Sequence, residues 1–292
     1  MIAVTGANGQ LGQEVIKSLL TKTDANNIVA LVRNLAKAEP LKALGVEVRH
    51  ADYSQPETLT NALVGVDKLL LISGSEVGQR VAQHQAVINA AKVQGVALLA
   101  YTSLLKADTS PMILAQEHKI TEAAIKASGL PAVIIRNGWY SENYVASIGG
   151  TLQAGVVAGS AGEGLMHTAT RQDYAEAAAI VLTSAEDHVG KVYELAGDEG
   201  FTLAQYAQLI SQISGKDIDY QAMSEADFTS MLVSVGLPEG LSTILADAEV
   251  QAEQGWLADD SKALSKLLGR PTTPIAETIT QMLTTQILIT RS

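Results

Sequence analysis

The chain has 292 residues, of which 47% are hydrophobic and 17% are charged, which excludes an intrinsically disordered chain and a coiled coil. Its net charge of −11 argues against general nucleic-acid binding, because proteins that neutralise phosphate backbones are usually basic. It contains no cysteine, which excludes disulfide bonds, thiolate nucleophiles and cysteine-ligated metals and suits a reducing compartment.

We expect no targeting signal in this sequence. The segment from Met1 to Thr5 has no basic region and leads at once into a glycine-rich turn, so we expect no secretory signal peptide. No stretch approaches the roughly 20 uninterrupted apolar residues of a membrane span. We therefore expect a cytoplasmic protein that binds neither nucleic acid nor membranes, and the sequence leaves a monomer and a homodimer both open.

The first 136 residues alternate between short β-branched runs and longer segments with helical spacing. The predicted strands are residues 2–5, 28–33, 46–50, 69–73, 97–102 and 132–136. Between them, apolar residues recur every three or four positions, as at Leu11, Val15 and Leu19. Near-continuous apolar strands that alternate with helices predict βαβ units and a parallel sheet covered on both faces.

The pattern changes after residue 137. Residues 137–164 are rich in glycine, serine and aromatics, a helix is predicted over 174–182, and a strand over 192–196. Thr202 is a predicted N-cap of a further helix, and short helices separated by glycine and proline follow from Met223. We expect an α/β fold of the Rossmann type, a doubly wound parallel sheet with a smaller, mostly helical C-terminal lobe. The sheet domain spans residues 1–137, completed by about 168–198, and the lobe spans 199–292 with 138–167.

A glycine-rich turn connects the first predicted strand to the first predicted helix. It has the pattern G-x-x-G-x-x-G and consists of Gly6, Ala7, Asn8, Gly9, Gln10, Leu11 and Gly12. Glycines permit the tight turn and close approach of a phosphate, and the start of the helix offers unpaired N–H groups and a positive dipole end. Although a tight turn without a ligand has the same pattern, the position after a strand in a βαβ chain favours dinucleotide binding.

The end of the second predicted strand bears on which dinucleotide is bound. An acid there would bind the ribose 2′-hydroxyl of NAD, whereas an arginine would bind the 2′-phosphate of NADP. The strand ends with Arg33 and Asn34 and has no acid, which favours NADP over the alternative of a solvated surface arginine. Asp52, after the third strand, could accept a bond from adenine or cap the next helix. Ser73 ends the fourth strand, either beside the cofactor or in an ordinary turn.

Six motifs resemble those of the NmrA-like branch of the atypical short-chain dehydrogenases and reductases. They are residues 4–12 (VTGANGQLG), 31–34 (LVRN), 71–73 with 76–80 (LIS and EVGQR), 101–104 (YTSL), 136–144 (RNGWYSENY) and 264–271 (LSKLLGRP). The first motif is generic, whereas the run 136–144 is specific to this group. Within the branch the chain is most similar to the bacterial type 2 NAD(P)H:quinone oxidoreductases and triphenylmethane reductases.

The resemblance implies an NADPH-dependent reductase with a cleft for a flat, quinone-like small molecule, and neither a metal nor a flavin. The turn from Gly6 to Leu11, Arg33 and Ser73 would hold NADPH, and Asn137 would lie near the nicotinamide. The residues that would border the substrate are Trp139, Tyr140 and Asn143. These aromatics, with Tyr144, could instead fill the hinge between the lobes.

Most short-chain dehydrogenases carry Tyr-x-x-x-Lys on one helix face, where the lysine lowers the tyrosine pKa so that it can protonate an alkoxide. If Glu122 matches the acid that commonly follows the lysine, His118 takes the lysine position and Leu114 the tyrosine position. An alignment shifted by one residue would place Lys119 in the site instead. We expect His118 and Tyr140 to be the catalytic residues, with His118 orienting the nicotinamide ribose or a substrate oxygen.

The missing tyrosine indicates the substrate class. Hydride addition to a simple ketone makes a basic alkoxide that needs a proton donor, whereas addition to a quinone makes a delocalised anion that water can protonate. We therefore predict direct hydride transfer to quinones or similar flat conjugated acceptors, without a covalent intermediate. The alternative is a non-catalytic NADP(H) sensor of the NmrA type. The absence of the Tyr-x-x-x-Lys pair argues against an epimerase or an ordinary ketone reductase.

Other candidate residues have ordinary structural explanations beside their functional ones. Ser103 ends the fifth strand and could face the substrate or form a buried capping bond, and Asp173 is expected to lie in the first turn of a helix. The five histidines show no metal-ligand spacing. A G-x-S-x-G motif is also missing, which argues against hydrolysis.

Overall fold

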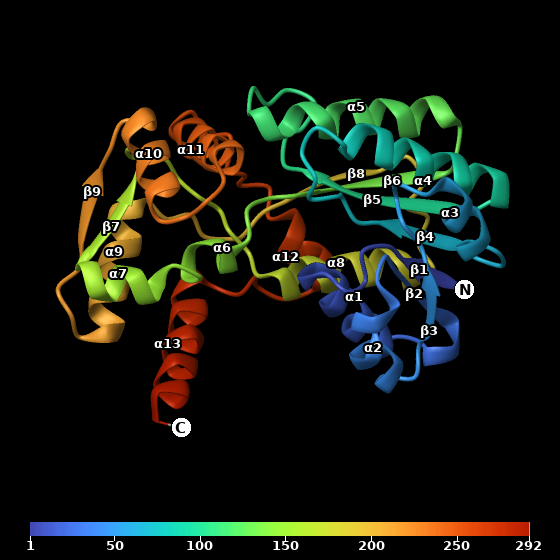
Figure 1. Ribbon diagram of the computed structural model, residues 1–292, viewed down its shortest axis with the longest axis horizontal. Helices are drawn as coiled ribbons and strands as arrows, with labels where there is room; N and C mark the ends of the chain where they lie inside the picture. Colours follow the sequence, from blue (N-terminus) through green and yellow to red (C-terminus); the bar gives the residue numbers. More distant parts are fainter. Residues whose placement is uncertain (292) are drawn as a thin grey trace. The chain divides into compact units, whose positions relative to one another are not determined.

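The computed structural model describes the backbone of residues 1–291 and the side chains of residues 1–285. The chain divides into two compact units (Figure 1). Unit 1 comprises residues 1–108, 116–137 and 171–194. Unit 2 comprises residues 109–115, 138–170 and the described chain from 195 onward. Each unit is therefore assembled from segments that are distant in the sequence.

Unit 1 is built on a seven-stranded sheet with the order β3-β2-β1-β4-β5-β6-β8. The strands are β1 (Ile2–Val4), β2 (Ile28–Val32), β3 (Glu47–His50), β4 (Lys68–Leu71), β5 (Leu98–Leu104), β6 (Ala132–Asn137) and β8 (Val192–Leu195). The first six of these pair in parallel. The strand order reverses between β1 and β4, which is where doubly wound sheets bind ligands. This order confirms the predicted Rossmann-type sheet.

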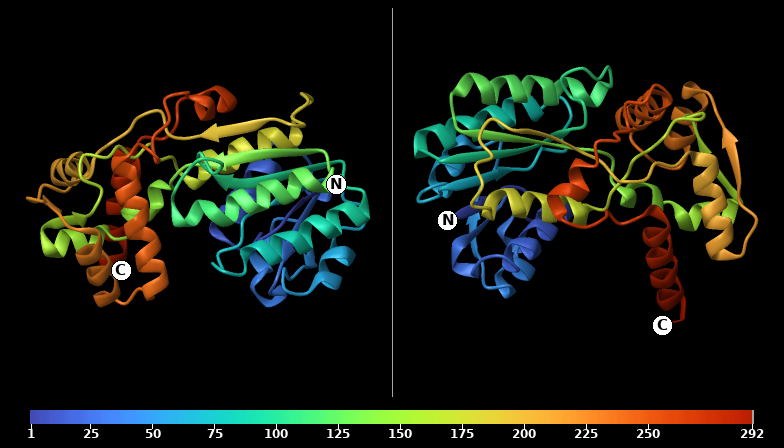
Figure 2. Two further views of the ribbon diagram at one scale, coloured as in Figure 1. Left: turned by 90° about the horizontal axis from the view of Figure 1, so that it is seen from above. Right: turned by 180° about the vertical axis from the view of Figure 1, so that it is seen from behind.

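Helices cover both faces of this sheet, which explains its apolar strands (Figures 1 and 2). Every residue of β2 and of β5 is buried. On one face, α3 (Pro56–Ala62), α4 (Arg80–Gln94) and α5 (Ile113–Ser128) contribute to one apolar core with the strands. On the other face, α1 (Gln10–Leu20) packs against α8 (Arg171–Thr183). Three short helical segments, at Ala25–Asn27, Leu35–Lys37 and Glu39–Ala43 (α2), join the first three strands.

Unit 2 is mostly helical, as predicted. Its helices are α6 (Ser141–Val145), α7 (Ile148–Ala154), α9 (Leu203–Ser214), α10 (Glu225–Ser234), α11 (Glu239–Glu253), α12 (Ala263–Leu268) and α13 (Ile275–Arg291). It also contains a parallel pair of strands, β7 (Val156–Gly159) and β9 (Asp219–Ala222), on which α9 packs. This pair was not predicted, because β7 lies in a glycine-rich segment and β9 is largely exposed.

Local signals correctly placed the start of α9. Thr202 accepts a hydrogen bond from the Gln205 backbone N–H, while the Gln205 side chain accepts one from the Thr202 backbone N–H, so that a complete capping box is formed. The predicted helix over 174–182 lies within α8, and Asp173 lies in its first turn as expected. None of the helices in the described part of the chain combines the length and apolar character that a membrane crossing requires.

Candidate active site

The glycine-rich turn links β1 to α1 at the carboxyl edge of the sheet in unit 1. Gly6 has a φ of +59°, which favours glycine, and a Cβ atom on Gly12 would lie 2.4 Å from the Gly6 carbonyl oxygen. Gly12 therefore lets the helix pack directly against the turn. Gly9 is the N-cap of α1, and no side chain caps this helix start. The first amide groups of α1 and its positive dipole end are thus available to an anionic ligand.

Two further contacts fix the turn beside the end of β2. The Ala7 N–H donates to the Leu31 carbonyl at 3.2 Å, and Asn8 Nδ2 donates to the Asn34 carbonyl at 3.1 Å. Arg33 is exposed next to this point, and its Nη1 lies 2.6 Å from Oε1 of Glu76. The hydrogen bond from Arg33 and its positive charge lower the pKa of Glu76, and the same pairing raises the pKa of Arg33.

The side chains after β3 have local structural roles. Asp52 Oδ1 accepts from the Ser54 N–H at 2.9 Å, and Oδ2 accepts from Gln55 Nε2 at 3.3 Å, so the carboxylate stabilises the turn just before α3. The neighbouring Tyr53 hydroxyl donates to the Ile72 carbonyl at 2.8 Å and lies 2.5 Å from Thr5 Oγ1. Burial raises the pKa of Tyr53, so this phenol remains protonated.

His118 lies on α5 and its side chain is buried against the sheet. Its Nδ1 lies 2.7 Å from the hydroxyl of Tyr101 on β5. Burial, reinforced by the charge of Arg80, lowers the pKa of His118 well below its ordinary value, so the ring is neutral. The next residue, Lys119, is exposed, and Leu114 is half-buried. Of the two candidates for the lysine position, His118 is therefore the one whose side chain packs toward the sheet.

The loop between β4 and α4 is held by residues that the sequence analysis did not single out. The Gly74 N–H donates to His84 Nε2 at 2.9 Å, and Arg80 Nε donates to the Gly74 carbonyl at 2.7 Å. Because Nε2 of His84 accepts, the ring hydrogen is on Nδ1, which donates to Thr121 Oγ1 at 2.9 Å. Burial lowers the pKa of His84 to about 3.

Only part of this arrangement could be found from the sequence. Arg80 falls within the motif 76–80 that carried the family resemblance, whereas nothing local distinguished His84, because its partners are distant in the sequence. At the start of the same loop, the Ser73 N–H donates to Thr102 Oγ1 at 2.9 Å. The backbone of the loop after β4 is thus fixed at both Ser73 and Gly74.

An ion cluster around the buried guanidinium of Arg136 lies at the carboxyl ends of β5 and β6. Arg136 Nε and Nη2 donate to the two oxygens of Glu122 at 2.9 and 2.6 Å. Its Nη1 lies 2.6 Å from Glu194 and 2.9 Å from Asp108. The Ser103 hydroxyl donates to Glu122 at 2.5 Å, so the structure gives Ser103 a buried structural bond.

Asn137 closes β6, and its side chain is buried. The Asn137 carbonyl accepts from the Leu105 N–H at 3.0 Å, which fixes the backbone. Its side-chain Oδ1 is buried and accepts no hydrogen bond from the described part of the chain. This buried acceptor is suited to a hydrogen-bond donor supplied by a ligand.

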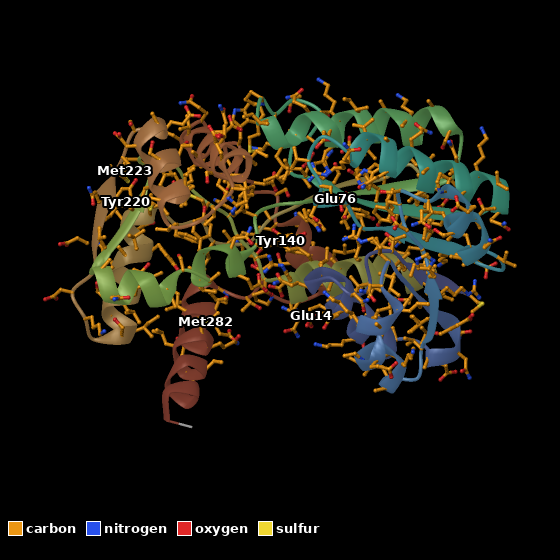
Figure 3. The ribbon with its side chains drawn as sticks, viewed as in Figure 1. Glu14, Glu76, Tyr140, Tyr220, Met223 and Met282 are labelled. Atoms are coloured by element: carbon orange, nitrogen blue, oxygen red, sulfur yellow. The ribbon has the colours of Figure 1, made fainter. Side chains whose placement is uncertain are left out.

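The aromatic run that follows Asn137 belongs to unit 2. The Ala169 N–H donates to the Trp139 carbonyl at 3.2 Å, and the Ser141 N–H donates to the Ala169 carbonyl at 3.0 Å. Trp139 is half-buried, as is Tyr140, which Figure 3 labels, and Asn143 is exposed. Tyr144 packs edge-on to Phe201 and Tyr206, with ring centroids 5.6 and 5.8 Å apart, so its ring belongs to the packing of unit 2.

The structure thus places the predicted site residues in two groups. Unit 1 contains the turn from Gly6 to Leu11 with Arg33, Ser73, His118 and Asn137, and unit 2 contains Trp139, Tyr140 and Asn143. Among the side chains the structure describes, no group of three or more histidines and carboxylates is arranged to hold a metal ion.

The strand order, the uncapped glycine turn at its reversal point and the helices on both faces define a Rossmann-type α/β protein. The chain belongs to the NmrA-like family, whose sequence model matches residues 1–272. It is 57% identical over 282 residues to quinone oxidoreductase 2 of Escherichia coli (strain K12), covering 97% of this chain and 98% of that protein. The resemblance found in the sequence motifs is confirmed.

Two solved structures extend this similarity. The NADPH-dependent quinone oxidoreductase from Escherichia coli, complexed with NADPH, matches with a TM-score of 0.94 and 57% identity over 97% of this chain and all 100% of that one. The triphenylmethane reductase of Citrobacter sp., complexed with NADP(H), matches with a TM-score of 0.93 and 40% identity over 97% and 100% of the two chains.

Proposed function

We propose that this protein is an NADPH-dependent reductase that transfers two electrons, as a hydride, to quinones and similar flat conjugated acceptors. The observation that carries this function is the 57% identity, over nearly the whole of both chains, to a quinone oxidoreductase whose structure contains NADPH. The free amide groups at the uncapped start of α1 suit the diphosphate of a dinucleotide, and the exposed guanidinium of Arg33 suits a 2′-phosphate.

The residues of unit 1 fit the cofactor. The amide groups from Gly6 to Leu11 would bind the diphosphate, and Arg33 would bind the 2′-phosphate. The fixed backbone at Ser73 would border the cofactor, and the buried Oδ1 of Asn137 would accept a hydrogen bond at the nicotinamide end. NADPH supplies the hydride when bound. Unit 1 is therefore the proposed dinucleotide-binding domain.

The remaining site residues are assigned to the substrate. Nδ1 of His118 is engaged with the Tyr101 hydroxyl, and with its ring hydrogen on Nε2 the histidine would donate to a substrate oxygen or to the nicotinamide ribose. We assign Trp139, Tyr140 and Asn143 to binding of the flat acceptor, with Tyr140 as the second catalytic candidate. Stacking on an aromatic ring and hydrogen bonding to a quinone oxygen together orient the acceptor for hydride transfer.

The protein needs no phenolic proton donor for this reaction. A quinone that accepts a hydride becomes a delocalised hydroquinone anion, and water supplies the proton. Burial raises the pKa of the Tyr53 and Tyr101 hydroxyls in unit 1, which suits a structural role rather than rapid proton transfer. A neutral His118 likewise contributes orientation rather than charge.

The function is tested by mixing purified protein with NADPH and a simple benzoquinone and following the absorbance of the reduced nicotinamide. We expect oxidation of NADPH that depends on both the protein and the acceptor. Binding of NADPH without acceptor-dependent oxidation would favour the sensor instead. No binding of either pyridine nucleotide would overturn the proposal.

A further inference from the structure

Arg33, whose guanidinium is assigned to the 2′-phosphate, already forms an ion pair with Glu76. Arg33 Nη1 lies 2.6 Å from Oε1 of Glu76, and the two side chains are 66% and 44% exposed. Glu76 is the only ion-pair partner of Arg33 among the side chains that the structure describes. The contact joins residues 43 positions apart in the sequence, so it is a tertiary contact rather than a local one.

The two residues flank the glycine-rich turn. Arg33 follows β2 and Glu76, labelled in Figure 3, lies on the loop after β4. In the sheet, β2 and β4 are the two neighbours of β1, from whose carboxyl end the turn begins. The ion pair therefore connects the two loops on either side of the strand that leads into the proposed cofactor site.

Glu76 is held from a second side, independently of Arg33. Its Oε2 accepts a hydrogen bond from Nε2 of Gln83 at 2.8 Å, and Gln83 is a buried residue of α4. The loop that carries Glu76 is itself fixed at Gly74 by His84 and Arg80. The carboxylate would consequently stay beside Arg33 even when the arginine turns to another anion.

We propose that Glu76 is a specificity-determining residue, which competes with the 2′-phosphate of NADPH for Arg33 and thereby reduces the preference for NADPH over NADH. The inference rests on the proposed function, because it requires that Arg33 bind the 2′-phosphate. NADH has a hydroxyl at that position and leaves the ion pair intact, so the competition acts on the phosphorylated cofactor alone.

Electrostatics sets the direction of the effect. A phosphate monoester carries between one and two negative charges near pH 7, and a fixed carboxylate beside the same guanidinium repels it. The exposed ion pair must also be broken or shared when the phosphate binds. Because both side chains are substantially exposed, each contribution is small, and their sum amounts to roughly a three- to tenfold change in affinity.

The test is Glu76→Gln, which removes the charge but keeps a side-chain oxygen for the hydrogen bond from Gln83. Dissociation constants are measured by titration calorimetry for NADPH and NADH, and for the fragments adenosine 2′,5′-bisphosphate and 5′-AMP. We expect about three- to tenfold tighter binding of the two ligands that carry a 2′-phosphate and less than about twofold change for the other two.

A matched control is Glu186→Gln, which makes the same change of charge at an exposed residue between α8 and β8. We expect it to leave all four dissociation constants within about twofold of the wild-type values. Glu76→Ala provides a second variant that removes the carboxylate entirely, and it should change binding in the same direction as Glu76→Gln.

Three outcomes would overturn the inference. Weaker NADPH binding in both Glu76 variants would show that the carboxylate orients Arg33 instead of competing for it. Equal tightening of all four ligands would indicate a general charge effect, and no change would show that the ion pair does not affect binding. Failure of the wild-type protein to bind NADPH would instead refute the proposed function itself.

Discussion

Two arginines at the carboxyl edge of the same sheet have opposite surroundings. Arg136, at the end of β6, is only 8% exposed, and all three of its guanidinium nitrogens contact carboxylates. Arg33, just after β2, is exposed and has one ion-pair partner among the described residues. The difference separates a side chain whose bonding capacity is used within the fold from one that retains donors for a ligand.

The same contrast holds for two histidines of unit 1. His84 uses both ring nitrogens, accepting from Gly74 and donating to Thr121. Among the described residues, His118 uses only Nδ1, which contacts the Tyr101 hydroxyl, and leaves Nε2 for a ligand. Residue type alone therefore does not separate the arginine and histidine proposed to bind a ligand from those used within the fold, whereas the number of polar atoms already satisfied by the protein does.

The largest expected effect is on the stability of the protein when Arg136, whose guanidinium nitrogens all contact carboxylates, is replaced. Arg136→Met would leave Glu122 and Glu194 without their cation in a mostly buried site, and we expect a loss of about 3–5 kcal/mol in the free energy of unfolding. Urea denaturation measures this loss. Arg33→Ala is the control, with an expected loss below about 1 kcal/mol because its ion pair is exposed. Similar losses of unfolding free energy for Arg136→Met and Arg33→Ala would contradict the distinction between the two arginines.

The next largest effect is on the binding of NADPH when Arg33 is replaced. Arg33→Ala should weaken NADPH binding by about ten- to a hundredfold, because charge-assisted hydrogen bonds contribute roughly 1.5–3 kcal/mol. NADH binding should change by less than about twofold, and titration of each nucleotide measures the two affinities. Equal losses for NADPH and NADH would show that Arg33 does not bind the 2′-phosphate.

The third prediction concerns how the stability of the protein depends on pH through His84 and His118. Burial lowers the pKa of both His84 and His118, so the unfolded chain takes up protons before the native protein does. Stability should therefore be complete above about pH 6.5 and fall as the pH drops below it, by up to about 1.4 kcal/mol per pH unit for each histidine. Urea denaturation between pH 7 and pH 5 measures this slope.

His84→Gln is the variant that tests the assignment of this slope. Removing one of the two neutral histidines should make the decline in stability toward pH 5 shallower than in the wild-type protein. A slope equal to that of the wild type would mean that protonation of His84 does not contribute.

The smallest expected effect concerns turnover. His118→Ala removes the donor assigned to orient the ribose or the substrate, and we expect kcat to fall by about tenfold, equivalent to roughly 1.4 kcal/mol. His118→Gln, whose amide can still donate, should retain more of kcat than the alanine variant. Steady-state kinetics with NADPH and benzoquinone distinguishes these results. If both variants changed only KM, His118 would act in binding and not in turnover.

The sequence predicted the features that local patterns encode. The six paired strands of the first 137 residues, the glycine turn and the Thr202 cap all depend on residues close together in the chain. The Arg33–Glu76 pair and the contacts of His84 were not predicted, because they join residues that only the completed fold brings together. The strands β7 and β9 were missed because β7 lies in a glycine-rich segment and β9 is largely exposed, so neither has the apolar run that marks the strands of the large sheet.

The interleaving of the two units constrains how the chain can fold during synthesis. The segment 171–194 supplies α8, which packs against α1, and Glu194, which pairs with Arg136. A nascent chain that has emerged only to residue 137 therefore lacks α8 beside α1 and lacks one of the three carboxylates that contact Arg136. Unit 1 can reach its final packing only after residue 194 has left the ribosome, by which time the first segments of unit 2 have emerged as well.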